Sequence, residues 1–179
     1  MILRLPICFL LVFWITSAIA DTELSKADKI KAAYLFNFTK YIRWPDSHFD
    51  NAAQDIHMCS AAPEVFNTFL SELVAGKTVN DNRSIIVFDD YRNVSVRCDL
   101  IFVKVLNDLD ENSVHNNRNG LIIGDDESLM ANGASIVFYI EDDHVKFEVN
   151  LGSLENQGYT LSSQLLKLAR LNKSESTTL

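Results

Sequence analysis

The sequence predicts a single α/β domain of three layers, with a mainly parallel sheet flanked by helices and closed by a late antiparallel hairpin. Two observations lead to this prediction. Short β-branched or almost continuously apolar segments, typical of buried strands, alternate with segments of helical period through most of the chain. The last part instead carries two strand patterns around a short acidic turn. Since neither an internal repeat nor a low-complexity linker divides the sequence, we expect one domain.

Residues 1–20 are typical of a secretory signal peptide. Arg4 is the only charge before a long apolar run, and Ala18-Ile19-Ala20 supplies small residues at both positions that an export cleavage site requires. A retained transmembrane anchor is the alternative, because the apolar run could span a membrane thinly. Cleavage leaves about 160 residues, which is enough for one core. We therefore expect an exported protein that does not insert into the membrane after cleavage.

The predicted domain covers residues 26–171, after a leader at 21–25. Lys26–Pro45 has the longest unbroken helical period. Pro45 disfavours helical geometry at Trp44, so the helix is expected to end there. The predicted buried face recurs at steps of three and four residues, and consists of Ile30, Ala33, Tyr34, Phe38, Tyr41 and Ile42.

Four strands with helices between them should follow. The strands are expected at Asp55–Ala61, Ser84–Phe88, Leu100–Leu106 and Gly120–Gly124. Between the first two strands, Pro63 suits the first turn of a helix and Gly76 its end. The polar segment Asp108–Arg118 could form a short, poorly buried helix. Because parallel strands require crossovers, these connections are expected to be right-handed.

The closing elements are a hairpin and a helix. The hairpin strands are expected at Ser135–Ile140 and Val145–Val149. A final helix is predicted over Thr160–Leu171, where Leu161, Leu165, Leu168 and Ala169 share one face. Residues 172–179 are polar and are expected to form a flexible tail.

Charge and cysteine usage limit the possible functions. The net charge of −8 argues against nucleic-acid binding, which needs a basic face. Cys8 leaves with the signal peptide, so the mature chain keeps Cys59 and Cys98. An even count in an oxidising compartment predicts one disulfide, with two free buried thiols as the alternative. A metal site is less favoured, because neither cysteine has a histidine or second cysteine at ligand spacing.

No catalytic, cofactor-binding or metal-binding residue is predicted. The sequence has no G-x-S-x-G elbow, no Walker loop and no G-x-G-x-x-G, and its four histidines are scattered. A catalytic triad assembled in space is the enzymatic alternative. Gly124–Glu127 follows a strand, where carboxylates could hold a divalent ion, although a helix cap at Asp125 or Asp126 is the simpler interpretation. Glu141–His144 is likewise interpreted as a hairpin tip. We expect a protein that is not an enzyme.

Much of the positive charge lies on the first helix. It comprises Lys26, Lys29, Lys31, Lys40 and Arg43. These residues could serve an anionic ligand or an acidic partner, and a solvated helix face is the alternative. Lys40 and Arg43 are the candidate ligand or partner contacts. The corresponding functional hypothesis is a periplasmic small-ligand receptor that binds an anion or a nucleotide near the first helix.

Three segments, in order and at this spacing, resemble the YfiR family of periplasmic proteins. They are the A-Y-x-x-N-F-x-K-Y-x-x-W-P opening at Ala33–Pro45, Phe147–Asn150, and Ser162–Ala169. The similarity covers nearly all of the mature chain. One departure is Gly133-Ala134, where the family often has two glycines.

The resemblance implies a non-catalytic periplasmic α/β protein that is often a homodimer. The best-known family member represses a membrane-bound diguanylate cyclase by binding its periplasmic sensory domain, which keeps cyclic-di-GMP and biofilm formation low. An outer-membrane lipoprotein relieves this repression by sequestering the repressor. Cys59 and Cys98 resemble one family disulfide. A second family disulfide has no counterpart here, because no further cysteines exist.

Overall fold

The computed structural model describes residues 23–50, 54–80, 82–89, 96–105, 107 and 120–172. The predicted signal peptide, the predicted helix Asp108–Arg118 and the tail after residue 172 lie outside them. In the described part of the chain, no helix is long and apolar enough to cross a membrane.

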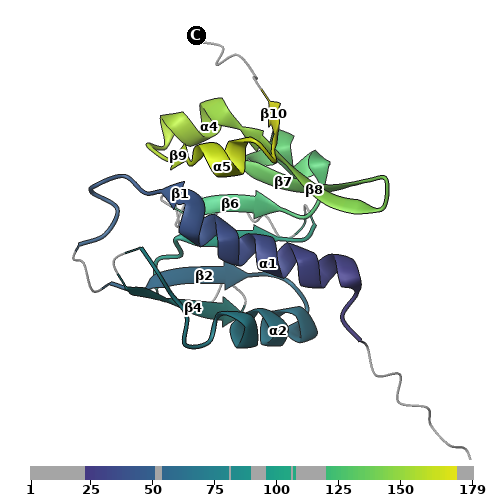
Figure 1. Ribbon diagram of the computed structural model, residues 1–179, viewed down its shortest axis with the longest axis horizontal. Helices are drawn as coiled ribbons and strands as arrows, with labels where there is room; N and C mark the ends of the chain where they lie inside the picture. Colours follow the sequence, from purple (N-terminus) through teal and green to yellow (C-terminus); the bar gives the residue numbers. More distant parts are fainter. Residues whose placement is uncertain are drawn as a thin grey trace, which may run out of the picture.

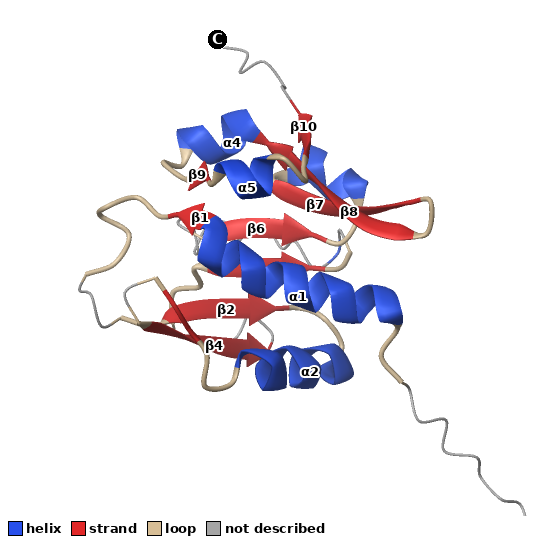
Figure 2. Cartoon of the chain, in the orientation of Figure 1, coloured by secondary structure: helices blue, strands red, loops and turns tan. Residues whose placement is uncertain are grey.

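One large mixed sheet organises the domain (Figures 1 and 2). From edge to edge its strands are β10 (Arg170–Asn172), β8 (His144–Asn150), β7 (Ile136–Glu141), β6 (Leu121–Gly124), β5 (Leu100–Val103), β2 (Ile56–Ser60), β4 (Arg83–Asp89) and β3 (Thr78–Val79). The neighbours from β7 through β4 are parallel, as are β8 and β10. The β7–β8 and β3–β4 pairs are antiparallel. The predicted mainly parallel α/β sheet with a late hairpin is confirmed.

The hairpin turn has the geometry that its sequence predicts. Asp142 and Asp143 both have positive φ, at 51° and 59°, which a two-residue turn matching the strand twist requires. Glu141 pairs with His144 across the turn. The acidic segment is therefore a hairpin tip, as expected.

Two helices cover one face of the sheet. They are α1 (Lys26–Tyr41) and α2 (Glu64–Val74), and both contribute to the larger apolar cluster of the core. Ser25 caps α1 by accepting a hydrogen bond from the Asp28 amide at 3.0 Å. A smaller cluster on the sheet includes Leu129 of the 3-10 helix η2 (Glu127–Asn132). Asp126 caps η2 by accepting from the Ser128 amide at 2.8 Å, in agreement with the capping interpretation.

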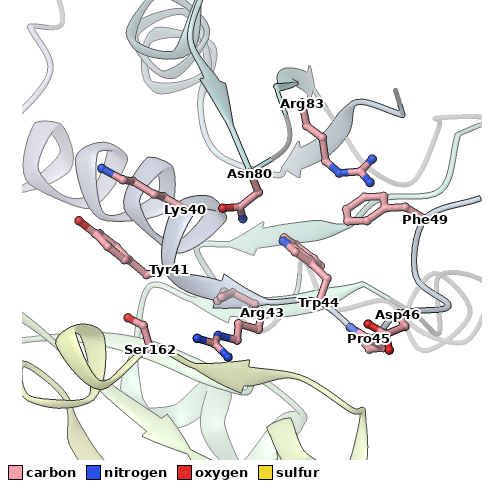
Figure 3. A pocket seen from close by; sticks show the side chains of 11 residues that line it. Lys40, Tyr41, Arg43, Trp44, Pro45, Asp46, Phe49, Asn80, Arg83 and Ser162 are labelled. Atoms are coloured by element: carbon pink, nitrogen blue, oxygen red, sulfur yellow. The ribbon is translucent and has the colours of Figure 1, made fainter. Parts of the chain in front are cut away.

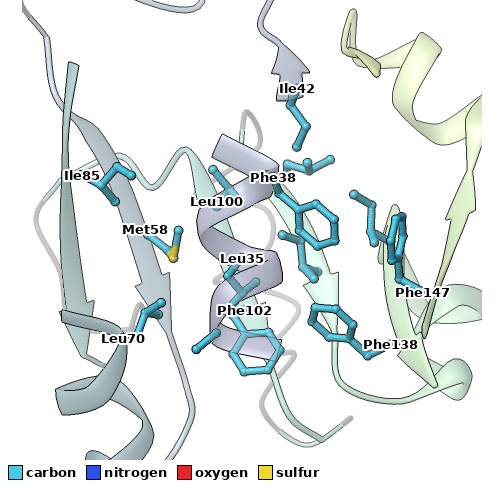
Figure 4. Packing of buried hydrophobic residues seen from close by; sticks show 14 of the residues in the cluster. Leu35, Phe38, Ile42, Met58, Leu70, Ile85, Leu100, Phe102, Phe138 and Phe147 are labelled. Carbon is cyan, nitrogen blue, oxygen red and sulfur yellow. The ribbon is translucent and has the colours of Figure 1, made fainter. Parts of the chain in front are cut away.

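Aromatic rings join α1 to the hairpin. Phe38 stacks on Phe138 with ring centroids 5.9 Å apart, and it meets the edge of Phe147 at 5.2 Å. Figure 4 shows these rings between the helix and strands β7 and β8. Burying aromatic side chains contributes strongly to core stability, and these ring geometries are the favoured ones. The helix is thus fixed on the sheet near its C-terminal end.

The predicted buried face of α1 is partly wrong. The helix residues that are buried are Ala32, Leu35, Phe38 and Thr39. Tyr34 and Ile30 pack against the core but keep some exposure. The buried stripe is rotated because α1 packs against α2 as well as against the sheet. A single-sequence period cannot show that second neighbour.

Two helix predictions need correction: the end of the first helix and the extent of the final one. Helix α1 ends at Tyr41, and β1 (Ile42–Arg43) follows and pairs with β9 (Thr160–Leu161) in a two-stranded sheet. The predicted final helix Thr160–Leu171 is wrong. Only α5 (Ser163–Leu166) is helical there, between β9 and β10. Strand pairing at both ends overrides the helical period, which leaves Leu168 64% exposed. A short helix, α4 (Leu151–Asn156), was not predicted.

Cys59 and Cys98 form a disulfide in this fold, which fits the expected pairing. Their Cα atoms lie 5.7 Å apart, and the bond closes a sequence separation of 39 residues. Both side chains are fully buried in the smaller apolar cluster. Cys98 directly precedes Asp99 and β5, so the bond fixes the entry to that strand on β2.

Candidate functional site

A pocket of about 690 Å³ opens where α1 ends. We call it the Trp44 pocket (Figure 3). Three segments that are distant in the sequence form it: the end of α1 with β1 and the chain after it, the turn before β4, and the residue after β9. Its lining residues are Lys40, Tyr41, Ile42, Arg43, Trp44, Pro45, Asp46, Phe49, Asn80, Arg83 and Ser162.

Hydrogen bonds to the last carbonyls of α1 hold these segments together. The last carbonyls of a helix have no partner within the helix, and here the pocket segments supply partners. Asn80 donates its side-chain amide to the Thr39 carbonyl at 3.2 Å. The Ser162 amide donates to the Tyr41 carbonyl at 3.0 Å. The negative end of α1 is therefore covered by donors and is less exposed to the pocket.

Cations surround the pocket on three sides. Figure 3 shows Lys40, Arg43 and Arg83 at separate positions on its rim. Lys40 and Arg43 are exposed, and among the described residues neither has a carboxylate within ion-pair distance. Arg83 is buried, donates to the Gln54 carbonyl at 2.7 Å and lies 3.9 Å from the centre of the Phe49 ring. The two exposed cations are thus the ones with charge left for a ligand.

Trp44 forms the floor of the pocket. Its ring contacts those of His48, Phe49 and Tyr159, at centroid distances of 4.8, 5.5 and 5.6 Å. Its Nε1 is buried and has no hydrogen-bond partner among the described residues. Figure 3 shows this nitrogen on the side of the ring that faces Asn80. A buried N–H without an acceptor is costly, so this atom marks a position where an acceptor would be stabilising.

A buried ionic cluster supports Trp44 from behind. His48 Nε2 lies 2.8 Å from Asp99 Oδ1, and Asp99 Oδ2 accepts from the His57 amide at 2.7 Å. Arg97 donates to the His48 carbonyl and lies 3.3 Å from Asp99. Every carboxylate oxygen of Asp99 therefore has a donor. The cluster fixes the loop that carries His48, and with it one face of the Trp44 ring.

Tyr159 lies between this cluster and Trp44. Its burial, followed by the nearby negative charge of Asp99, raises the pKa of the Tyr159 hydroxyl to about 12. The hydroxyl therefore stays neutral at any physiological pH. A second, smaller pocket of about 360 Å³ lies beside it and is lined in part by His48, Arg97 and Gln157.

The acidic segment after β6 does not form an open site. Lys31 Nζ lies 2.5 Å from Asp125 Oδ1, and Lys104 Nζ lies 3.4 Å from Asp125 Oδ2 and 3.0 Å from Asp28. Burial opposes ionisation of Asp28, but hydrogen bonds from Lys104 and Ser25 outweigh it and lower the pKa of this carboxyl. Within the described residues, no group of three potential ligands could hold a metal ion.

The sequence led to Lys40 and Arg43, and the structure places both on the rim of one pocket. It did not predict Trp44, Arg83 or Asn80 as neighbours of these cations. The W-P pair after the helix was the one available signal for Trp44, and it was interpreted as a helix stop. Arg83 and Asn80 follow α2 in the sequence, about 40 residues after Lys40, so only the folded sheet brings them close to it.

The structure thus defines an α/β domain with a pocket that Lys40, Arg43 and Arg83 line. The profile of the YfiR/HmsC-like family matches residues 28–170, so the chain belongs to this family. Members of the family are periplasmic regulators that act with a partner regulatory protein rather than as catalysts.

Other comparisons are weaker. No curated protein matches the sequence significantly. A solved structure described as a conserved domain protein from Vibrio cholerae O1 biovar eltor is 12% identical, with a TM-score of 0.47. The alignment covers 84% of this chain and 61% of that chain.

Proposed function

We propose that this protein is an exported, non-enzymatic repressor of a membrane diguanylate cyclase. It binds the periplasmic sensory domain of the cyclase and so lowers cyclic-di-GMP and biofilm formation. The observation that carries the proposal is the family match over residues 28–170, which spans almost the entire predicted domain. The predicted signal peptide at residues 1–20 supports a periplasmic location. An outer-membrane lipoprotein that sequesters the repressor, and a homodimeric state, complete the proposal.

A gene deletion tests the repression. We expect the deletion strain to contain more cyclic-di-GMP, measured by mass spectrometry of cell extracts, and to form more biofilm. Expression of the full chain in trans should restore both. The matched control deletes the cognate cyclase as well, and in that strain loss of this protein should have no further effect. Unchanged cyclic-di-GMP in the single deletion would refute repression.

The direct contact needs a separate measurement. The purified mature protein and the periplasmic domain of the cyclase should form a complex in calorimetry, and light scattering after gel filtration should give the mass of a homodimer for the repressor alone. An elevated cyclic-di-GMP level without any complex would place the effect elsewhere in the pathway.

A second candidate function is small-ligand binding, which the Trp44 pocket favours. Its volume of about 690 Å³ lies within the range of ligand pockets in proteins. Its mixture of aromatic walls and a few convergent polar groups is also typical of such sites. Calorimetry of the mature protein with amino acids and nucleotides separates this function from protein–protein repression alone.

A further inference from the structure

We propose that the Trp44 pocket binds a small organic anion, with a carboxylate or phosphate accepting a hydrogen bond from Trp44 Nε1 and a flat apolar group packed on the aromatic walls. The inference rests on the second candidate function and is independent of repression. Three properties of the pocket support this inference: its charge, its unsatisfied donor and its shape.

The charge of the pocket opposes that of the whole protein. The chain carries a net charge of −8. Among its lining residues, however, the pocket has Lys40, Arg43 and Arg83 and one carboxylate, Asp46. Since the charges of Lys40 and Arg43 are not neutralised by described neighbours, an anion entering the pocket gains their attraction. Such a local excess of one sign also concentrates oppositely charged ligands.

One buried donor in the pocket has no hydrogen-bond acceptor among the described residues. Trp44 Nε1 can only donate, and no described atom accepts from it. A carboxylate or phosphate oxygen would accept from Trp44 Nε1, whereas an ammonium group could not. The unsatisfied donor therefore disfavours a cationic group at this position and is compatible with the anion that the cations attract.

The shape of the pocket indicates the rest of the ligand. Trp44 and Phe49 stand at an angle of 63° with centroids 5.5 Å apart, and Tyr41 and Pro45 add apolar surface to the lining. Aromatic faces at this spacing favour a planar group in offset or edge contact. The ligand would touch segments that are far apart in the sequence, since Ser162 lines the same pocket as Lys40.

Isothermal titration of the full mature protein tests the ligand class with three matched probes. These are benzoate and phenyl phosphate, which combine an anion with a ring, and benzyl alcohol, which is neutral. We expect the two anions to bind, and benzyl alcohol to bind at least about tenfold more weakly, because it lacks the charge-assisted hydrogen bond. Raising the salt concentration should weaken the anions more than the alcohol.

Two variants test the residues. Trp44→Phe keeps the ring and removes the donor, so we expect about tenfold weaker benzoate binding. The double variant Lys40→Gln with Arg43→Gln should also weaken benzoate binding, and should abolish most of its salt dependence. Lys26→Gln is the control, because this exposed lysine lies at the other end of α1. It should bind benzoate as the wild type does. Circular dichroism and melting temperatures establish that each variant is folded.

Each outcome is decisive. Equal binding of benzyl alcohol and benzoate would overturn the anion assignment while leaving small-ligand binding intact. Benzoate binding unchanged by Trp44→Phe would overturn the role of the indole nitrogen. The absence of binding by all three probes at about 10⁻² M, a concentration that would fill a site with a millimolar Kd, would overturn the inference. The second candidate function would be refuted only if amino acids and nucleotides also failed to bind. The deletion experiment would still test repression.

Discussion

The two ends of helix α1 both gather charged side chains, but they treat them in opposite ways. At the N-terminal end, Asp28, Lys31, Lys104 and Asp125 pair with one another at 2.5 to 3.4 Å. The side chain of Asp125 is only 9% exposed. At the C-terminal end, Lys40 and Arg43 are exposed and without described carboxylate partners, beside a tryptophan donor that has no acceptor. At the first end the charges neutralise one another, whereas at the second two cations have no described carboxylate partner.

This difference reverses the usual position of sites in α/β sheets. Ligands in such folds commonly bind beyond the carboxyl ends of the parallel strands. Here Lys104 and Asp125 follow β5 and β6 at that edge, and they neutralise each other. The open pocket lies at the opposite edge, where Arg83 begins β4. The fold alone would therefore have pointed to the edge opposite the Trp44 pocket.

Removing the disulfide should cause the largest loss of stability, and it should act mainly near the pocket. Replacing Cys59 and Cys98 together by serine removes a cross-link across 39 residues. In the chain-entropy model such a loss costs about 4 kcal/mol of the free energy of unfolding. Urea denaturation measures this cost.

Amide hydrogen exchange shows where the disulfide variant loosens. Because Cys98 holds the residue before Asp99, exchange should rise more around His48 than around Asp28. Reduced wild-type protein is the control and should behave alike. Equal loss of protection at both ends of α1 would contradict a local role of the bond at the pocket.

Asp125→Asn should give the next largest loss of stability, and it acts at the N-terminal end of α1. It keeps the shape of the side chain but removes the negative charge from between Lys31 and Lys104. Breaking a fully buried ion pair costs more, but both lysines keep some exposure, so we expect a loss of about 1–2 kcal/mol. Urea denaturation measures this loss. Glu155→Gln, at an exposed position, is the control, and an equal loss in that variant would mean that net charge and not pairing matters.

The pairs at the N-terminal end of α1 should also make stability depend on pH. Hydrogen bonding lowers the pKa of Asp28 despite its partial burial. A carboxyl with a lowered pKa stabilises the fold above its unfolded pKa, and this contribution is lost as the pH falls through the folded value. For a pair with this exposure we expect about 0.5 kcal/mol.

The variant Asp28→Asn isolates this contribution. Denaturation midpoints of wild type and variant should differ near neutral pH and converge as the pH falls through the lowered folded pKa of Asp28, below which the carboxyl is protonated in both states. The pKa of Lys104 is raised: burial lowers it, but the hydrogen bond and charges of Asp28 and Asp125 together outweigh that effect. The pair therefore persists on the alkaline side of this window. A constant difference between wild type and variant across the acid range would refute the linkage.

The sequence predicted most of the sheet strands but not the short strands β9 and β10. Strands rich in apolar β-branched residues, such as Leu100–Val103, are recognisable because both of their faces are buried. Thr160–Leu161 and Arg170–Asn172 are short edge or satellite strands, defined by partners far away in sequence. Leu161, Leu165 and Leu168 recur at helical spacing across this segment, so the local pattern predicted a helix.

The candidate site was predictable only in its cations. Lys40 and Arg43 stand near a helix end in the sequence, and that position can be inferred from period and proline alone. The unsatisfied Trp44 donor could not be predicted, because satisfaction of a hydrogen bond depends on atoms that the fold brings together. Arg83 reaches the pocket through β4, which is placed by pairing with β2.

Trp44→Phe should have a net effect on stability close to zero, and it tests whether the pocket end of α1 holds an unsatisfied donor. The variant loses some buried ring area but also removes a buried donor without a described acceptor, whose desolvation costs about 1–3 kcal/mol. These contributions oppose each other, so the unliganded protein should unfold within about 1 kcal/mol of wild type in urea. Tyr159→Phe is the matched control in the same aromatic cluster. Buried tyrosine hydroxyls are usually hydrogen-bonded, so that loss should cost about 1 kcal/mol. If Trp44→Phe instead destabilised the unliganded protein by about 3 kcal/mol or more, the indole N–H would have a hydrogen-bond partner in the free protein. The pocket would then offer a ligand no unsatisfied donor at Trp44.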